Sequence, residues 1–139
     1  MELYYQSPRF RVSWDPTIEA VINGGEGFVE GDELRRGMDK GLELLIQKRS
    51  SKWLAEMSQR KVHTDVDQKW IVDDWTPRAA AAGLRYTAFV LPTSLVSMMS
   101  LKRMTRFVAE QRLEMRYVDD LEEARRWLKS VGVRPQTGV

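Results

Sequence analysis

The residue with the widest chemical repertoire in this sequence is His63, because it is the single histidine of a chain that has no cysteine. A nucleophilic site would therefore need His63 as its base, with a nearby carboxylate to orient it and a hydroxyl to attack. The neighbouring candidates are Ser58, Thr64, Asp65 and Asp67. All of them lie in one short segment, whereas such triads are usually gathered from distant parts of a chain. We predict no catalytic residue and interpret His63 as an exposed loop histidine.

The same residue types do not favour a metal or cofactor site. One histidine and no cysteine leave only carboxylates as strong ligands. The pair Asp65-x-Asp67 lacks the glycine and the terminal glutamate of a calcium loop. The run Gly24-Gly25-x-Gly27 is not followed by the Lys-Ser/Thr pair of a phosphate loop, and turn geometry accounts for it. We therefore expect no metal, no cofactor and no enzymatic activity.

Positive charge gathers in residues 47–61. This stretch holds five cationic side chains and one carboxylate: Lys48, Arg49, Lys52, Arg60, Lys61 and Glu56. Aromatic residues are not interleaved with these charges as a base-stacking surface would require. The net charge of the chain is only +2. We interpret the stretch as a solvated loop edge, and nucleic acid is not the partner we expect.

Large apolar side chains are the other unusual feature, since the chain has five tryptophans and seven methionines. Core packing is the default interpretation of the tryptophans. A pocket lined by Trp70, Trp75 and nearby methionines is the sharper hypothesis. Met98 and Met99 stand ahead of the regular part of a predicted helix, where flexible methionine suits a surface exposed to a partner or a ligand.

The elements that must position these residues alternate along the chain. Apolar alternation predicts strands at residues 10–14 and 18–22, with residues 3–6 as an extension, and at 53–57, 86–91 and 113–117. Helical spacing and caps predict helices at residues 32–48 with Asp32 as N-cap, after Thr64, at 76–82, from Leu101 after a Ser100 cap, and after Asp120. This order predicts a single α/β domain over residues 1–139. We expect a mixed, mostly parallel sheet of four to five strands that begins antiparallel, and about four helices.

Two glycines within the first predicted helix indicate how that helix packs. Gly37 and Gly41 lie on the same face as Leu34, Met38 and Leu42. A glycine inside a helix costs about 1 kcal/mol relative to alanine, so two of them on the apolar face need a compensating reason. We expect this helix to approach the sheet closely at both glycines.

The predicted binding site lies where two strands end. Ligands of open α/β sheets meet the loops beyond the carboxyl ends of the strands. If the strands at residues 53–57 and 86–91 are parallel neighbours, the loops at residues 58–64 and 92–100 emerge at one edge. The candidate binding residues are Arg60, Lys61, His63, Thr64, Trp70, Trp75, Met98 and Met99. They would form a cationic rim beside an apolar lip.

Several short strings, in this order, resemble the SpoIIAA-like family of STAS-related bacterial proteins. They are Glu30-Gly31, Lys52-Trp53-Leu54, Trp75-x-Pro77 with Ala82-Gly83-Leu84, and Ala124-Arg125-Arg126-Trp127-Leu128. The resemblance implies a STAS-like fold and a regulatory module that binds a protein partner. Family members switched by phosphorylation carry an Asp-Ser-x-Gly-like turn after the third strand. This chain has residues 58–65 there without such a turn, so we expect no phospho-switch at Ser58 or Thr64.

Two functions follow as hypotheses. The first is a non-enzymatic module for protein–protein interaction in bacteria, and it leaves a homodimer open. The second is a carrier or sensor of a small apolar or lipid-like ligand, because the same fold group resembles the CRAL-TRIO lipid carriers. The sequence shows neither a signal-peptide pattern nor an apolar run of membrane-spanning length, so we expect a cytoplasmic protein.

Overall fold

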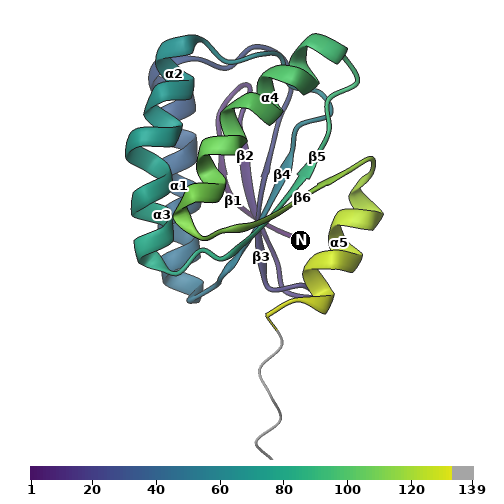
Figure 1. The fold of residues 1–139 in the computed structure, drawn as a ribbon. Coiled ribbons are helices and arrows are strands. Elements are labelled where there is room, and N and C mark those ends of the chain that lie inside the picture. Colours follow the sequence, from purple (N-terminus) through teal and green to yellow (C-terminus); the bar gives the residue numbers. More distant parts are fainter. Residues whose placement is uncertain (133–139) are drawn as a thin grey trace, which may run out of the picture.

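The computed structural model describes residues 1–132 of the chain, and a six-stranded mixed sheet lies at its centre (Figure 1). The strands lie in sequence order: β1 (Glu2–Gln6), β2 (Arg11–Asp15), β3 (Ala20–Gly24), β4 (Lys52–Glu56), β5 (Tyr86–Val90) and β6 (Glu114–Val118). The pairs β1–β2 and β2–β3 are antiparallel, and the other three pairs are parallel. The predicted α/β class and antiparallel start are confirmed. The predicted count of four to five strands is wrong, because residues 2–6 form a strand of their own rather than an extension.

The helices form two unequal layers. They are α1 (Gly31–Lys48), α2 (Asp65–Trp70), the π-helical turn η1 (Ile71–Trp75), α3 (Thr76–Ala82), α4 (Leu95–Val108), the 3₁₀ turn η2 (Ala109–Gln111) and α5 (Leu121–Ser130). The helices α1, α3 and α4 cover one face of the sheet, and α5 covers the other (Figure 1). The helices that connect neighbouring parallel strands cross over with the same hand, so they all lie on the same face of the sheet. This accounts for the larger layer.

Each strand of the sheet's centre divides its side chains between two cores. On β3, Val21 packs in the larger core with α1, whereas Ala20 and Ile22 pack in the smaller core with α5. This alternation follows from the period of two along a strand. The larger core holds most of the aromatic and methionine side chains, so the interior features relevant to binding lie on that face.

The helix α1 touches the sheet through its glycines, as predicted. A Cβ added to Gly41 would lie 2.3 Å from Trp53 Cη2, and one added to Gly37 would lie 2.4 Å from Phe10 Cδ1. Both separations are far below a normal carbon–carbon contact of about 3.5 Å. Two aromatic rings therefore occupy the space that side chains at these helix positions would need.

Between β4 and β5, residues 65–82 form one continuous helix rather than the two predicted. The π-helical turn η1 joins α2 to α3, and Thr76, predicted as an N-cap, lies inside the helix. The Thr76 N–H donates to the Ile71 carbonyl five residues earlier, and its hydroxyl donates to the same oxygen at 2.7 Å. Pro77 has no N–H to donate. The wider turn just before it lets the helix pass through a residue that would otherwise end it.

Several predicted element boundaries are wrong by a few residues. Helix α1 begins after Glu30 rather than Asp32. Helix α4 begins six residues before Leu101, with the Ser94 hydroxyl accepting from the Ser97 N–H at 3.4 Å in place of the expected Ser100 cap. The caps predicted at Thr64 and Asp120 are confirmed, since each side chain accepts a backbone N–H three residues later.

The strand predicted at residues 18–22 is β3, which lies two residues later, at Ala20–Gly24. The side chain of Asp15 accepts hydrogen bonds from the N–H and the hydroxyl of Thr17, at 2.9 and 2.6 Å. These bonds close a turn at residues 16–19, so Ile18 lies in the turn, where it is nevertheless buried. A buried apolar residue in a turn carries the same sequence signal as one in a strand.

No helix in residues 1–132 combines the length and the apolar character needed to cross a membrane.

The close approach of α1 generates a stability prediction. The substitution Gly41→Leu forces a side chain into the Trp53 ring, and we expect the free energy of unfolding to fall by about 1–3 kcal/mol. Gln47→Leu, an exposed position on the same helix, is the matched control and should change it by less than about 0.5 kcal/mol. Urea denaturation followed by circular dichroism measures both. Equal midpoints for the two variants would contradict the packing.

Candidate functional site

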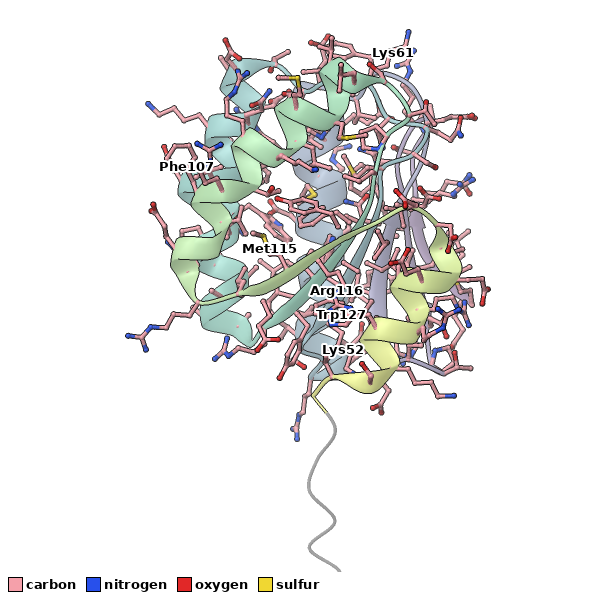
Figure 2. The ribbon with its side chains drawn as sticks, turned by 45° about the vertical axis from the view of Figure 1, so that its right-hand side comes forward. Lys52, Lys61, Phe107, Met115, Arg116 and Trp127 are labelled. Atoms are coloured by element: carbon pink, nitrogen blue, oxygen red, sulfur yellow. The ribbon has the colours of Figure 1, made fainter. Side chains whose placement is uncertain are left out.

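The loops after β4 and β5 meet at one edge of the sheet. The two strands are parallel neighbours in a register that pairs Lys52 with Tyr86 and Glu56 with Val90. The segments 57–64 and 91–94 therefore leave the sheet side by side, as the sequence predicted for parallel neighbours. Figure 2 shows Lys61 at the end of the molecule where these loops lie.

A third segment is paired with the loop after β4. The Gly27 N–H donates to the Gln59 carbonyl at 2.9 Å, and the Lys61 N–H donates to the Gly27 carbonyl at 3.1 Å. Together they form a parallel bridge between Gly27 and Arg60, beyond the ends of β3 and β4. Because the backbone is extended at this bridge, neighbouring side chains point to opposite sides. Arg60 turns inward and is buried, whereas Lys61 stays exposed.

Arg60 is a buried cation held by neutral groups. Its side chain is 5% exposed, and its Nη2 donates to the Gly24 carbonyl at 2.7 Å and to Asn23 Oδ1 at 3.1 Å. The guanidinium lies 4.6 Å from the centre of the Phe10 ring. Within residues 1–132 no carboxylate lies within ion-pairing distance of it. The interpretation of Arg60 as part of a solvated loop edge is therefore wrong.

The charge of Arg60 persists at neutral pH in spite of its burial. Burial lowers the pKa of its guanidinium to about 10, Glu33 opposes that effect, and Arg11 adds to it. Charged hydrogen bonds to Asn23 and Gly24 and the π face of Phe10 replace part of the lost hydration. Arg60 thus fixes the loop to the end of β3.

His63 is buried and neutral, not exposed as predicted. Its side chain is 9% exposed. Burial first, and then the charge of Arg60, lower its pKa to about 4; a hydrogen bond to the backbone of Val29 and the charge of Asp67 act in the opposite direction. Its Nδ1 is buried and has no hydrogen-bond partner among the described residues. The histidine lies inside because the bridge at Gly27 draws its loop against the end of the sheet.

Thr64 and Asp67 hold the loop in place through contacts with α2 and α1. The Thr64 hydroxyl accepts from the Asp67 N–H at 3.1 Å and so caps α2. Asp67 is buried, and its carboxylate accepts from the Gly31 N–H at 3.0 Å at the start of α1. Arg35 Nε lies 3.9 Å from the same carboxylate. These contacts leave the carboxylate occupied with α1.

An apolar cavity of about 50 Å³ lies within the larger core, between the sheet and the helices α3 and α4. Its walls include Met38, Trp53, Trp75, Phe89 and Val108. Trp75 donates its Nε1–H to the Met38 carbonyl at 2.9 Å and meets Trp53 edge-on at 4.9 Å. Two of the candidate binding residues predicted from the sequence, Trp75 and His63, therefore line the cavity. Phe89 and Val108 gave no signal beyond that of ordinary core residues.

The other predicted wall residue, Trp70, does not reach the cavity. It is partly exposed and lies on the surface, with the guanidinium groups of Arg35 and Arg78 at 5.4 and 5.8 Å from its ring centres. Its apolar surface is thus covered by the side chains of α1 and α3 rather than by a ligand.

A small surface recess adjoins the cavity at the carboxyl edge of the sheet. Its walls include Lys61, Val62, Gln68, Pro92 and Ser97. Four residues line both the recess and the cavity: Met57, His63, Leu101 and Met104. Gln68 reaches across this region, since its Nε2 donates to the His63 carbonyl at 2.8 Å and to the Ser100 hydroxyl at 3.2 Å. The four shared side chains form the partition between interior and surface.

Met98 and Met99 are not brought to this site. Both lie within α4, so the expectation that they precede its regular part is wrong. Neither lines the recess or the cavity, and Met99 is 56% exposed on the outer side of the helix. Met104 and Leu101, one to two turns later, take the place predicted for them. Because α4 already begins at Leu95, Met98 and Met99 are part of the helix, and its period directs them away from the recess and the cavity.

No cluster of three His, Asp or Glu side chains that could hold a metal ion occurs within residues 1–132. Comparisons with protein-family models, with curated proteins and with solved structures found no match.

The buried histidine generates a pH prediction. The unfolded chain binds a proton at His63 near pH 6.5, whereas the folded chain binds it only near pH 4. Between these values the unfolded state takes up more protons, so the free energy of unfolding falls as the pH drops from 6.5 to 4, by about 3 kcal/mol. His63→Phe, which cannot titrate, should lack this component. Urea denaturation of both proteins across pH 4–7.5 measures the difference.

The carboxylates of the chain titrate in both proteins and cancel in that difference. Parallel curves of unfolding free energy against pH for wild type and His63→Phe would show that His63 is not neutral and buried.

Proposed function

We propose that this chain is a non-enzymatic binding domain that takes up a small apolar ligand in the cavity beneath α4. The observation that carries the proposal is the arrangement of an apolar cavity and a surface recess that share four lining residues. Sites for small molecules are concave, mostly apolar and furnished with few polar groups, and they lie at the carboxyl ends of the strands in open α/β sheets.

The cavity as it stands is smaller than a ligand with a ring requires. An engineered cavity of about 150 Å³ holds benzene, three times the volume found here. Three of its wall residues, Met38, Met57 and Met104, are methionines, whose unbranched side chains repack readily. The backbone of α4 packs more against η1 than against any strand. Uptake of a ligand therefore requires rotation of methionine side chains and a small displacement of α4.

The family proposal has its own support. The order of short strings described above resembles SpoIIAA-like proteins, and we propose that the chain is a STAS-like domain on that ground. The same fold group resembles the CRAL-TRIO lipid carriers, and this resemblance is consistent with a ligand-binding role. A bacterial, cytoplasmic, regulatory role follows from the same resemblance and is part of the proposal.

Native mass spectrometry of protein purified from its own host tests the ligand. We expect a bound small molecule that dissociates on solvent extraction. A spectrum that contains only the mass of the chain would argue against a carrier, and a bound protein would favour an interaction module.

A cavity-filling variant links that ligand to the cavity. Val108→Phe adds a ring to the cavity wall, and we expect the protein to remain folded with an unfolding temperature at or above that of the wild type and to lose the bound small molecule. Val66→Phe makes the same change at an exposed position of α2 and should retain the ligand. Retention of the molecule by folded Val108→Phe would place it elsewhere.

A second candidate function, the protein-interaction module, is favoured by the outer side of α4. Val96, Met99 and Phe107 are 71%, 56% and 51% exposed and follow a spacing of three to four residues or a multiple of it. Figure 2 shows Phe107 on the outside of the helix. The helix carries Lys102, Arg103 and Arg106 and no acidic residue. An apolar stripe among cations suits an acidic protein surface with an apolar centre.

The double variant Met99→Asp/Phe107→Asp tests this surface. If α4 binds a protein, capture of that partner from host lysate should fall at least tenfold, because two buried contacts are replaced by carboxylates that repel an acidic surface. Val66→Asp, an exposed change on α2, is the control. Capture at wild-type level by the folded double variant would exclude the α4 surface, and size-exclusion chromatography shows whether the captured partner is a second copy of the chain.

A further inference from the structure

The partition between recess and cavity contains a buried polar atom without a partner. Nδ1 of His63 is shielded from solvent and makes no hydrogen bond within residues 1–132. A buried polar atom left unpaired destabilises the fold, and a ligand group that pairs with it removes that penalty. His63 lines both the recess and the cavity, so a molecule that occupies the cavity also meets this side chain.

The protonation state of the ring decides which chemistry Nδ1 offers. Burial and the charge of Arg60 keep the imidazole neutral at neutral pH. A neutral imidazole has one protonated and one unprotonated nitrogen, so an unpaired Nδ1 either accepts or donates one hydrogen bond. A hydroxyl group can be the partner in either case, because it both donates and accepts.

We propose that Nδ1 of His63 is the polar anchor of the ligand site and forms a hydrogen bond with a hydroxyl group of an otherwise apolar molecule. This inference rests on the proposed function and adds the ligand class to it. Phenols and aliphatic alcohols carry such a group. The hydroxyl would lie at the partition, and the apolar remainder would lie in the cavity.

Anionic ligands fit the cavity poorly. Its wall is largely apolar and contains no cationic side chain, so a carboxylate there would lose its hydration without gaining an ion pair. Arg60 lines the recess, where its Nη2 donates to Gly24 and Asn23 and its Nε is buried without a partner. The cavity therefore favours a neutral ligand.

Three other polar side chains of the cavity wall are engaged within the fold. The hydroxyl groups of Thr76 and Thr105 donate to the carbonyls of Ile71 and Leu101, at 2.7 and 2.8 Å. Asn23 accepts from Arg60. Thr87 is the remaining hydroxyl of the wall, and Thr87→Val shows whether it serves as the anchor in place of His63.

A matched pair of probes tests the anchor. The probes 4-ethylphenol and 4-ethyltoluene have nearly the same shape and differ in a hydroxyl against a methyl group. Isothermal titration at pH 7.5 gives the ratio of their association constants for each protein. We expect this ratio to fall by about tenfold to a hundredfold in His63→Phe, because the buried phenol hydroxyl loses its hydrogen-bond partner. Thr87→Val removes another polar group from the cavity wall and should leave the ratio unchanged.

A measurement on the wild-type protein avoids any folding defect of the variant. The chain has one histidine, so its two imidazole ¹⁵N resonances belong to His63 alone. Addition of 4-ethylphenol should shift the Nδ1 resonance, because this nitrogen gains a hydrogen-bond partner, whereas 4-ethyltoluene should leave it in place.

The outcomes separate the anchor from the cavity. A ratio that falls in His63→Phe, together with the phenol-specific Nδ1 shift, supports the anchor. Binding of both probes with an unchanged ratio and no Nδ1 shift would overturn the anchor and leave the proposed function standing. Failure of both probes to bind the wild-type protein would overturn both.

Discussion

The site depends on one interaction, the attachment of the Arg60 guanidinium to the end of β3. The charge is buried without a carboxylate, so its hydration must be replaced by Asn23, Gly24 and the Phe10 ring. Loss of these bonds would leave the two oxygen acceptors and the cation unpaired, at about 1–3 kcal/mol for each acceptor. The loop after β4 is therefore held across the end of the sheet. Burial first, and then the charge of Arg60, keep His63 neutral.

This attachment in turn rests on the glycines of α1. Phe10 lies beneath Arg60 on one side and against Gly37 on the other, so a side chain at Gly37 would displace the ring that faces the guanidinium. Gly41 does the same for Trp53, which meets Trp75 edge-on. The two glycines thus admit the aromatic side chains that shape the floor of the site and one wall of the cavity. The cost of glycine within a helix is offset by this packing.

The cavity follows from the contrast between α1 and α4. Helix α1 lies directly on aromatic rings, whereas α4 is separated from the sheet by long side chains such as Met104 and Leu101. Rigid aromatic rings fill the interior where the helix backbone lies close to the sheet. Flexible methionine side chains fill the wider space under α4. An interior space under α4 and a partition built largely of flexible side chains are the result. His63 is the rigid polar member of that partition.

Local pattern and tertiary contact contributed different parts of this protein. The alternation of strands and helices, the caps at Thr64 and Asp120, and the parallel pairing that brings two loops to one edge all follow from the sequence, because periodicity and capping are encoded within a few neighbouring residues. The burial of His63 and Arg60 does not follow from it. The sequence of their loop is cationic and polar. Only the bridge to Gly27 and the bonds to Asn23 and Gly24, 37 and 36 positions away, draw it inside. The start of α4 was misplaced for a similar reason, since Leu95 and Val96 are exposed apolar residues that show no helical face of their own.

By itself the sequence determined the α/β class and the edge of the sheet where binding is proposed. The tertiary structure decided which side chains at that edge face inward, because burial is set by contacts between residues that are distant in the chain.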